Sequence, residues 1–315
     1  MTPIAHWPGE FVGEVFVTAV PPAGGEPALC VHGLAGSARN WTDLMAALRP
    51  RLDCVAVDLP GYGESPPPPD GGYSITAQAR TVATLIERQG RGPVHLIGNS
   101  LGGAVSARVA ARRPDLIRSL TLISPALPDL RPRMDLVRFP LMSVPRVGAW
   151  ALTKFKTVSP ERRVFNVLAT CYYDANSVPK ERFDAEVAEL TRRDALPYSD
   201  DVLIGSVRSL TAESLRAGAR SPWREAARIS APTLVIYGSH DRLVSPLMAG
   251  RAARTITGSK VVVLPRTGHV AMMEHPELVA AEIGVLLGGI PVGSDPLLGR
   301  TGAQNGEHSV AAAAG

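Results

Sequence analysis

Cysteine is scarce in this chain of 315 residues, where it occurs only at positions 30, 54 and 171. An odd number of cysteines without metal-ligand spacing argues against both a disulfide framework and a zinc site. Cys30 and Cys54 lie in apolar runs typical of strands, so we expect them to be small buried hydrophobic residues. No two histidines stand three or four residues apart, and we therefore expect no metal site.

Long hydrophobic runs are absent as well. No uninterrupted apolar run approaches about 18 residues, the length that a membrane-spanning helix requires. The first ten residues contain Pro3 and Pro8 and no apolar core, which argues against a secretory signal. We therefore expect a cytoplasmic protein without a transmembrane segment.

The charged residues form no concentrated patch along the sequence. The net charge is +4, and the 33 basic residues, nearly all of them arginine, are scattered along the chain. Proteins that bind nucleic acids gather such residues on one face or along one helix. We therefore expect no nucleic-acid partner. No segment repeats at a fixed period, which excludes a solenoid.

A serine between glycines stands out against this background. The pentad Gly98-Asn99-Ser100-Leu101-Gly102 fits G-x-S-x-G, which places a serine on a strained turn between a strand and a helix. In a chain with 30 glycines the pentad alone is weak evidence, so its flanks decide. Residues 94–97 have the composition of a buried strand, and residues 104–112 that of a helix. The sequence thus predicts an exposed, nucleophilic Ser100.

A nucleophilic serine needs a base to accept its proton and a carboxylate to orient that base, and both follow in the chain. Asp241 comes three residues after the apolar strand predicted for residues 232–238. His269 follows the strand predicted for residues 260–265. We predict Asp241 as the acid and His269 as the base, in the order Ser, acid, His.

Two further motifs complete the pattern: His32-Gly33-Leu34-Ala35-Gly36-Ser37 and Asp58-Leu59-Pro60-Gly61-Tyr62-Gly63-Glu64-Ser65. With the serine pentad and the loop of His269, they resemble the α/β-hydrolase superfamily in its lid-bearing form, over most of residues 9–289. The alternation of strands and helices agrees with the fold that this resemblance implies, a mostly parallel sheet with helices on both faces and an inserted helical cap.

The resemblance also implies roles for backbone groups. The N–H groups of Leu34 and Leu101 would form the oxyanion hole, and removing one such donor typically costs about 10²–10³ in rate. His32 is expected to order its loop through hydrogen bonds. Asp129 is the alternative acid, because some relatives carry the acid after the preceding strand. The chemistry requires no cofactor.

The sequence divides into four segments. Residues 1–124 and 223–290 are expected to form the hydrolase core, residues 125–222 the cap, and residues 291–315 a disordered tail that lacks apolar periodicity. Within the core we expect strands at 11–20, 53–59 and 116–123 and helices at 41–48, 75–88 and 274–287. The apolar cap residues expected to divide between the substrate pocket and packing within the cap are Phe139, Leu141, Met142, Val147, Trp150, Leu152, Phe155, Tyr172 and Tyr173.

Serine at the elbow disfavours the chemistry of epoxide hydrolases and dehalogenases, which resemble this family but carry aspartate there. We predict a serine esterase or lipase acting on a predominantly apolar small-molecule ester. One alternative is carbon–carbon hydrolysis of ring-cleavage products by enzymes with a similar G-N-S-x-G-G elbow, although those usually have Trp where this chain has Val270. In that case Arg192 or Arg193 of the cap could hold a substrate carboxylate, although we expect both to lie on a solvated face. Another is a receptor-like member with slow turnover. The sequence leaves the natural substrate and homo-oligomer formation open.

Overall fold

The computed structural model describes residues 7–129 and 143–288, and their core is one eight-stranded sheet in the order β1-β2-β4-β3-β5-β6-β7-β8. The strands are β1 (Gly9–Val12), β2 (Val15–Ala19), β3 (Glu26–Val31), β4 (Leu52–Val57), β5 (Val94–Asn99), β6 (Ile117–Ile123), β7 (Thr233–Gly238) and β8 (Lys260–Leu264). From β4 to β8 every neighbouring pair is parallel, whereas β1 and β2 pair antiparallel at the edge.

The strand predicted for residues 11–20 is wrong as a single element. The chain turns at Gly13, whose φ of 65° favours glycine, so that β1 and β2 form a hairpin. The central strands β4, β5 and β7 are buried at every residue. This explains why they are mostly apolar in the sequence without a polar residue at every second position, because a parallel sheet is covered on both faces.

Helices cover both faces of the sheet, as the sequence predicted. One apolar cluster joins the sheet to α2 (Ile75–Gln89), α3 (Leu101–Arg112), α9 (Pro222–Ala226) and α10 (Met248–Thr255). A second joins it to α1 (Thr42–Leu48), α11 (Ala271–Glu274) and α12 (Pro276–Leu286). The single helix predicted for residues 274–287 is replaced by α11 and α12, with His275 between them and Pro276 opening α12. Short 3₁₀ helices are η1 (Ala38–Trp41), η2 (Pro114–Leu116), η4 (Ala175–Ser177) and η5 (Gly218–Arg220).

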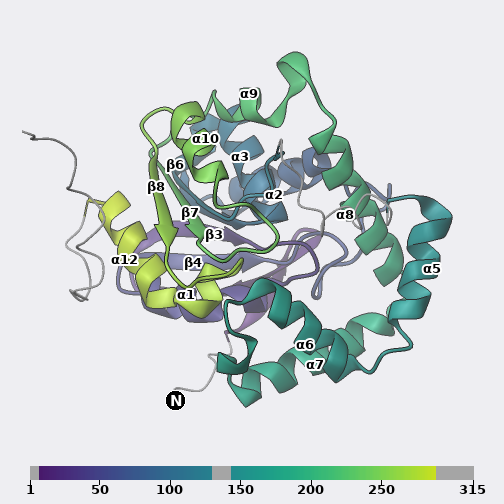
Figure 1. The fold of residues 1–315 in the computed structure, drawn as a ribbon. Coiled ribbons are helices and arrows are strands. Elements are labelled where there is room, and N and C mark those ends of the chain that lie inside the picture. The colour runs from purple at the N-terminus through teal and green to yellow at the C-terminus, as the bar shows by residue number, and fades with distance from the viewer. Residues whose placement is uncertain (1–6, 130–142, 289–315) are drawn as a thin grey trace, which may run out of the picture.

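Between β6 and β7 lies a helical segment, which we call the cap: residues 143–214 with α5 (Pro145–Phe155), α6 (Pro160–Cys171), α7 (Lys180–Asp194) and α8 (Ser199–Ser214). Figure 1 shows these helices gathered to one side of the sheet, away from α12. Three apolar residues predicted for the pocket or cap core, Phe139, Leu141 and Met142, lie outside the described residues, as does the tail at 291–315.

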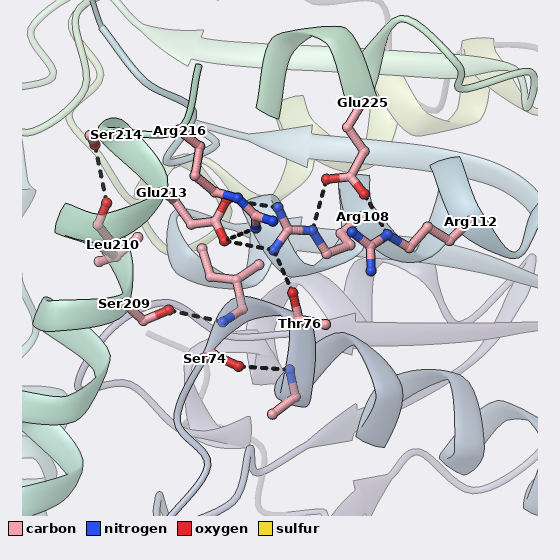
Figure 2. A network of polar contacts seen from close by, with 12 residues as sticks. Ser74, Thr76, Arg108, Arg112, Ser209, Leu210, Glu213, Ser214, Arg216 and Glu225 are labelled. Carbon is pink, nitrogen blue, oxygen red and sulfur yellow. Dashed lines mark hydrogen bonds and ion pairs between the residues drawn. The ribbon is translucent and has the colours of Figure 1, made fainter. Parts of the chain in front are cut away.

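A buried ionic network joins the end of the cap to the core (Figure 2). Arg108 of α3 is 3% exposed and donates to Glu213 of α8 at 2.7 and 2.8 Å and to Glu225 of α9 at 2.8 Å. It also donates to Thr76 of α2 at 3.1 Å. Because α3 starts directly after Ser100, the network fixes the cap against the helix that follows the predicted nucleophile.

Candidate active site

Ser100 occupies the turn between β5 and α3 in a strained backbone conformation. Its φ of 53° and ψ of −117° are unfavourable for a residue with a side chain. The neighbouring strand holds it there, because Ser100 N donates to Ile123 O at 3.0 Å, and Ala126 N donates to Ser100 O at 2.9 Å. The half-buried serine therefore sits at the carboxyl end of β5, turned out of the regular strand.

The glycines around Ser100 are required by close backbone approaches. A Cβ on Gly102 would lie 2.1 Å from Val31 O, and one on Gly98 would lie 2.5 Å from Gly102 O. A Cβ on Gly33 would lie 3.1 Å from the Cβ of Ser100. The loop after β3 is thus packed against the serine, which places the neighbouring Leu34 on the same side of the sheet.

Leu101, the other predicted oxyanion donor, is the first residue of α3 and is fully buried. The first N–H groups of a helix have no acceptor within the helix, so they remain able to bind an anionic oxygen. Leu34 is half-buried in the loop that Gly33 brings against Ser100. Leu101 thus directly follows the serine, and Leu34 directly follows the glycine that approaches it.

Asp241 and His269 form a direct pair. His269 Nδ1 lies 2.9 Å from Asp241 Oδ2, and the two residues are 3% and 1% exposed. The other carboxylate oxygen accepts hydrogen bonds from Leu243 N at 2.8 Å and Val244 N at 2.9 Å. Burial alone would raise the pKa of Asp241, but the interaction with His269 and the backbone donors lower it. An ionised Asp241 accepts a hydrogen bond from the Nδ1–H group of His269. This keeps the proton on Nδ1 and leaves Nε2 as the basic nitrogen.

Asn99 connects this pair to the serine. Its Nδ2 donates to Ile123 O and to His269 O, both at 3.1 Å, and Asn99 directly precedes Ser100. Within the described residues no hydrogen bond joins Ser100 Oγ to the His269 ring. Catalytic hydrogen bonds of this kind often tighten only when substrate binds.

His32 binds backbone groups of two loops. Its Nδ1 lies 2.7 Å from Gly33 O, and its Nε2 accepts from Leu59 N at 3.0 Å. Burial lowers the pKa of His32 to about 4, in accord with a neutral ring that accepts at Nε2 and donates at Nδ1. It is an ordering residue for the loops after β3 and β4, as the sequence indicated.

The alternative residues have other partners. His269 pairs with Asp241 rather than with Asp129. Arg192 donates to Glu189 and to Gly63 O, and Arg193 donates to Ala35 O at 2.7 Å. Both arginines thus join the cap to core loops, which weakens their prediction as ligands of a substrate carboxylate.

A cavity lies between the cap and the loops after β3 and β4. Its apolar lining includes Ala35, Tyr62, Leu152, Phe155 and Val202, with ionic pairs such as Lys156 and Asp200 among the lining residues. Among the cap residues singled out in the sequence, Leu152 and Phe155 line this cavity. Tyr172 is buried in an apolar cluster, whereas Val147, Trp150 and Tyr173 are exposed.

Sequence reasoning missed two polar residues near the triad. Asn99 was visible only as a variable position of the pentad. Glu274, five residues after His269, accepts hydrogen bonds from Gly268 N and Tyr173 N, and only its distance from His269 along the chain was visible beforehand. No helix among the described residues has the length and apolar character to span a membrane, and no cluster of potential metal ligands occurs in the same residues.

Comparison with known proteins identifies the family of the chain. Residues 27–276 match the family model described as the alpha/beta hydrolase fold. Lipase 1 of Psychrobacter immobilis is 25% identical over 79% of this chain and 73% of its own length. A 2-hydroxy-6-oxononadienedioate/2-hydroxy-6-oxononatrienedioate hydrolase of Cupriavidus pinatubonensis is 26% identical over 80% of this chain and 83% of its own.

A third relative is longer than the aligned region. The dihydrolipoyllysine-residue acetyltransferase component of the acetoin cleaving system of Cupriavidus necator is 28% identical over 84% of this chain. The match spans 64% of that relative, less than two thirds of its length. A family match across most of this chain, together with the strand order and the strained serine, leads to one conclusion. The chain belongs to the α/β-hydrolase family.

Proposed function

We propose that this protein is a serine hydrolase that cleaves a carboxylic ester of a predominantly apolar small molecule. The observation that carries the proposal is the buried pair of His269 and Asp241. Asn99, the residue before the strained Ser100, donates a hydrogen bond to the backbone oxygen of His269 and so connects this pair to the serine turn. Acyl transfer by a serine requires a histidine that an ionised carboxylate orients, and the pair of His269 and Asp241 supplies this part of the arrangement.

In the proposed reaction Ser100 Oγ attacks the ester carbonyl while His269 Nε2 accepts its proton. The N–H groups of Leu34 and Leu101 stabilise the oxyanion that forms. The C–O bond to the alcohol breaks as His269 returns the proton to the leaving oxygen, which leaves an acyl group on Ser100. Water, deprotonated by His269, then attacks this acyl group, releases the acid and restores the serine.

Carbon–carbon hydrolysis is the second candidate, because the segment from Gly98 to Gly103 has the G-N-S-x-G-G pattern and a relative named as a dienedioate hydrolase is 26% identical. Two observations make it weaker. Val270 follows the histidine, and both cap arginines considered for a substrate carboxylate already bind backbone carbonyls.

Labelling with a fluorophosphonate probe and turnover of p-nitrophenyl butyrate test the proposal. We expect Ser100→Ala to abolish both and to keep the wild-type melting temperature, because it removes a hydroxyl from a turn without loss of core volume. His269→Ala should be nearly as severe, since the triad acts as a unit. Asp241→Asn should reduce turnover far more than Asp129→Asn.

Labelling of Ser100→Ala at the wild-type rate would contradict the assignment of the nucleophile. A larger loss in Asp129→Asn than in Asp241→Asn would make Asp129 the acid. Rapid labelling with tight ligand binding but a single turnover would favour the receptor-like alternative.

A further inference from the structure

The loop that carries His269 rests on the backbone of the cap. His269 N donates to Cys171 O at 2.6 Å, at the C-terminal residue of α6. The approach is so close that a Cβ on Gly268 would lie 2.3 Å from the same carbonyl oxygen. The position of the predicted base therefore depends on where the end of α6 lies.

Glu274, the last residue of α11, spans the same junction with one carboxylate. Its Oε1 accepts from Gly268 N at 2.7 Å, and its Oε2 accepts from Tyr173 N at 2.8 Å. Glu274 is held in place by its own N–H, which donates to Val270 O at 3.0 Å. One oxygen thus binds the residue before His269, and the other binds the cap segment just after α6.

The loop of Asp241 also contacts this end of the cap. Arg242 donates to Ala169 O, and the ring of His240 lies 4.6 Å from that of Tyr173, edge to face. Residues on both sides of Asp241 therefore contact α6 or the segment after it. The end of α6 is a common support for the loops of the acid and the base.

The pKa of Glu274 is raised, so this carboxylate takes up a proton at a higher pH than an ordinary glutamate does. Burial raises its pKa, and the N–H groups of Tyr173 and Gly268 lower it. The neighbouring His275 acts in the same lowering direction, whereas Asp241 raises the pKa. From the cap, Cys171 and Tyr172 face this group as neutral side chains, because burial raises the pKa of both.

We propose that Glu274 is a positioning residue for His269, holding the base in place by fastening its loop to the end of α6. This inference rests on the proposed function of His269 as the general base. Both bridging bonds need an acceptor oxygen, which the carboxylate supplies on each side. Glutamine has one carbonyl oxygen and one NH2 group, so in the same conformation its NH2 donor would face one of the two N–H groups without accepting from it.

Kinetic constants for p-nitrophenyl butyrate in Glu274→Gln test the bridge. We expect kcat to fall by about 10²-fold, the cost of a displacement near 1 Å at a catalytic group, with KM changed less than about threefold. Glu277→Gln is the matched control, since Glu277 is an exposed glutamate in the first turn of α12. The control should retain wild-type kcat.

A pH profile separates positioning from general stability. On the acid side, wild-type kcat/KM should fall more steeply than that of Glu274→Gln, because only the wild type loses the bridge when Glu274 is protonated. Parallel acid limbs, or a fall in kcat that simply follows the fraction unfolded, would overturn the proposal.

Tyr173 provides a second variant, in case glutamine at position 274 prevents folding. Tyr173→Pro removes the N–H that Glu274 binds, and Tyr172, with φ −94° and ψ 154°, has a conformation that tolerates a following proline. Tyr173→Ala is its control, because it removes the ring and keeps the N–H. We expect Tyr173→Pro to reduce kcat well below the value for Tyr173→Ala, and equal values would overturn the proposal.

A measurement without turnover distinguishes failure of this inference from failure of the proposed function. The proton on His269 Nδ1 faces Asp241, and its NMR resonance should shift or broaden in Glu274→Gln but not in Glu277→Gln. An unchanged resonance would contradict the positioning role whether or not the protein hydrolyses esters. If the Ser100 and His269 variants all kept wild-type ester turnover, the proposed function would be contradicted instead.

Discussion

At the scale of single residues, the surroundings of the predicted nucleophile Ser100 differ from those of Ser119, which contacts a histidine that in turn contacts an acid. Ser119 Oγ lies 2.7 Å from His95 Nδ1, and His95 Nε2 lies 2.5 Å from Glu26 Oε2. Ser119 is a 6% exposed residue within β6, without the positive φ of Ser100. It also lies toward the amino ends of the strands, opposite the Ser100 turn. The positive φ at a turn between strand and helix, rather than contact among three residue types, therefore distinguishes Ser100 from Ser119.

The glycines beside Ser100 give a prediction for stability and labelling. We expect Gly102→Ala to destabilise the fold by about 1–3 kcal/mol or more, because its Cβ would overlap Val31 O. Gly250→Ala is the control, since this helical glycine faces only Arg254, at 3.4 Å, and alanine should stabilise α10 by up to about 1 kcal/mol. Urea unfolding and the rate of probe labelling measure both. Equal and neutral effects would show that the elbow does not require glycine.

His32 gives a prediction for the pH dependence of stability. Its folded pKa of about 4 lies below the ordinary value of 6.5, so the unfolded chain takes up its proton first. The contribution is fully present above pH 6.5 and is lost as the pH falls toward 4, with a full extent of about 3 kcal/mol. When the pH is lowered from 7.5 to 4, the unfolding free energy of the wild type should therefore decrease relative to that of His32→Gln.

Because Asp58 also titrates in this range, the quantity to compare is the difference between the unfolding free energies of the wild type and His32→Gln at each pH. Burial raises the pKa of Asp58 to about 6, which makes stability fall as the pH rises through the same range. This opposite slope is present in both proteins and cancels when the two curves are subtracted. Parallel curves for the wild type and His32→Gln would contradict the assignment of a neutral His32.

The residues of the site were predictable to different degrees. Ser100, Asp241 and His269 each follow an apolar strand, and this local pattern made them visible in the sequence. Asn99 binds the backbone of His269, which lies 170 residues away in the sequence. Glu274 binds the backbone of Tyr173, which lies 101 residues away. A single sequence contains no local pattern for such partners, because only the folded chain brings them together.

At the scale of elements, the sequence predicted type better than extent. The helices predicted for residues 41–48 and 75–88 correspond to α1 and α2 within a residue. For α2 the ends are marked by the capping Ser74 and by Gly90 in the left-handed conformation. The hairpin of β1 and β2 and the break before α12 were missed. In both places a single Gly or Pro ends an element inside an otherwise continuous apolar pattern.

The network of Arg108 in Figure 2 gives a prediction at this scale. Arg108→Met should destabilise the protein by about 3–5 kcal/mol, because Glu213 and Glu225 lose their buried partner. Adding Glu213→Gln and Glu225→Gln should recover much of that loss. Arg112→Met, at a side chain that is 48% exposed, is the control and should cost about 0–1 kcal/mol.

Urea unfolding monitored by circular dichroism measures the unfolding free energies of the wild type, Arg108→Met, the triple variant and Arg112→Met. A loss in Arg108→Met no larger than that in Arg112→Met would show that the network does not fasten the cap. A triple variant less stable than Arg108→Met would show that the two glutamates stabilise the protein through other contacts.

At the scale of the whole molecule, the cap contacts the core through α6, α7 and α8, and Arg192 and Arg193 of α7 bind the loops after β4 and β3. The end of α6 contacts the loops of Asp241 and His269, and the end of α8 joins α3 and α9 through the ionic network. The cavity lined by Leu152, Phe155 and Tyr62 lies between the cap and the core loops. We expect this cavity to receive the apolar part of the substrate in the proposed reaction.

This arrangement predicts that specificity rises with the length of the acyl chain. Each methylene buried in an apolar pocket contributes about 0.8 kcal/mol, so four more methylenes, from acetyl to hexanoyl, raise kcat/KM by up to roughly two orders of magnitude. The series of p-nitrophenyl acetate, butyrate, hexanoate and octanoate measures this rise. Leu152→Ser should reduce it, because Leu152 lines the cavity, whereas Leu247→Ser, at a side chain that is 76% exposed, should not. A flat or falling series would contradict an apolar acyl pocket, and faster turnover of a ring-cleavage dienoate than of every ester would assign the site to carbon–carbon hydrolysis.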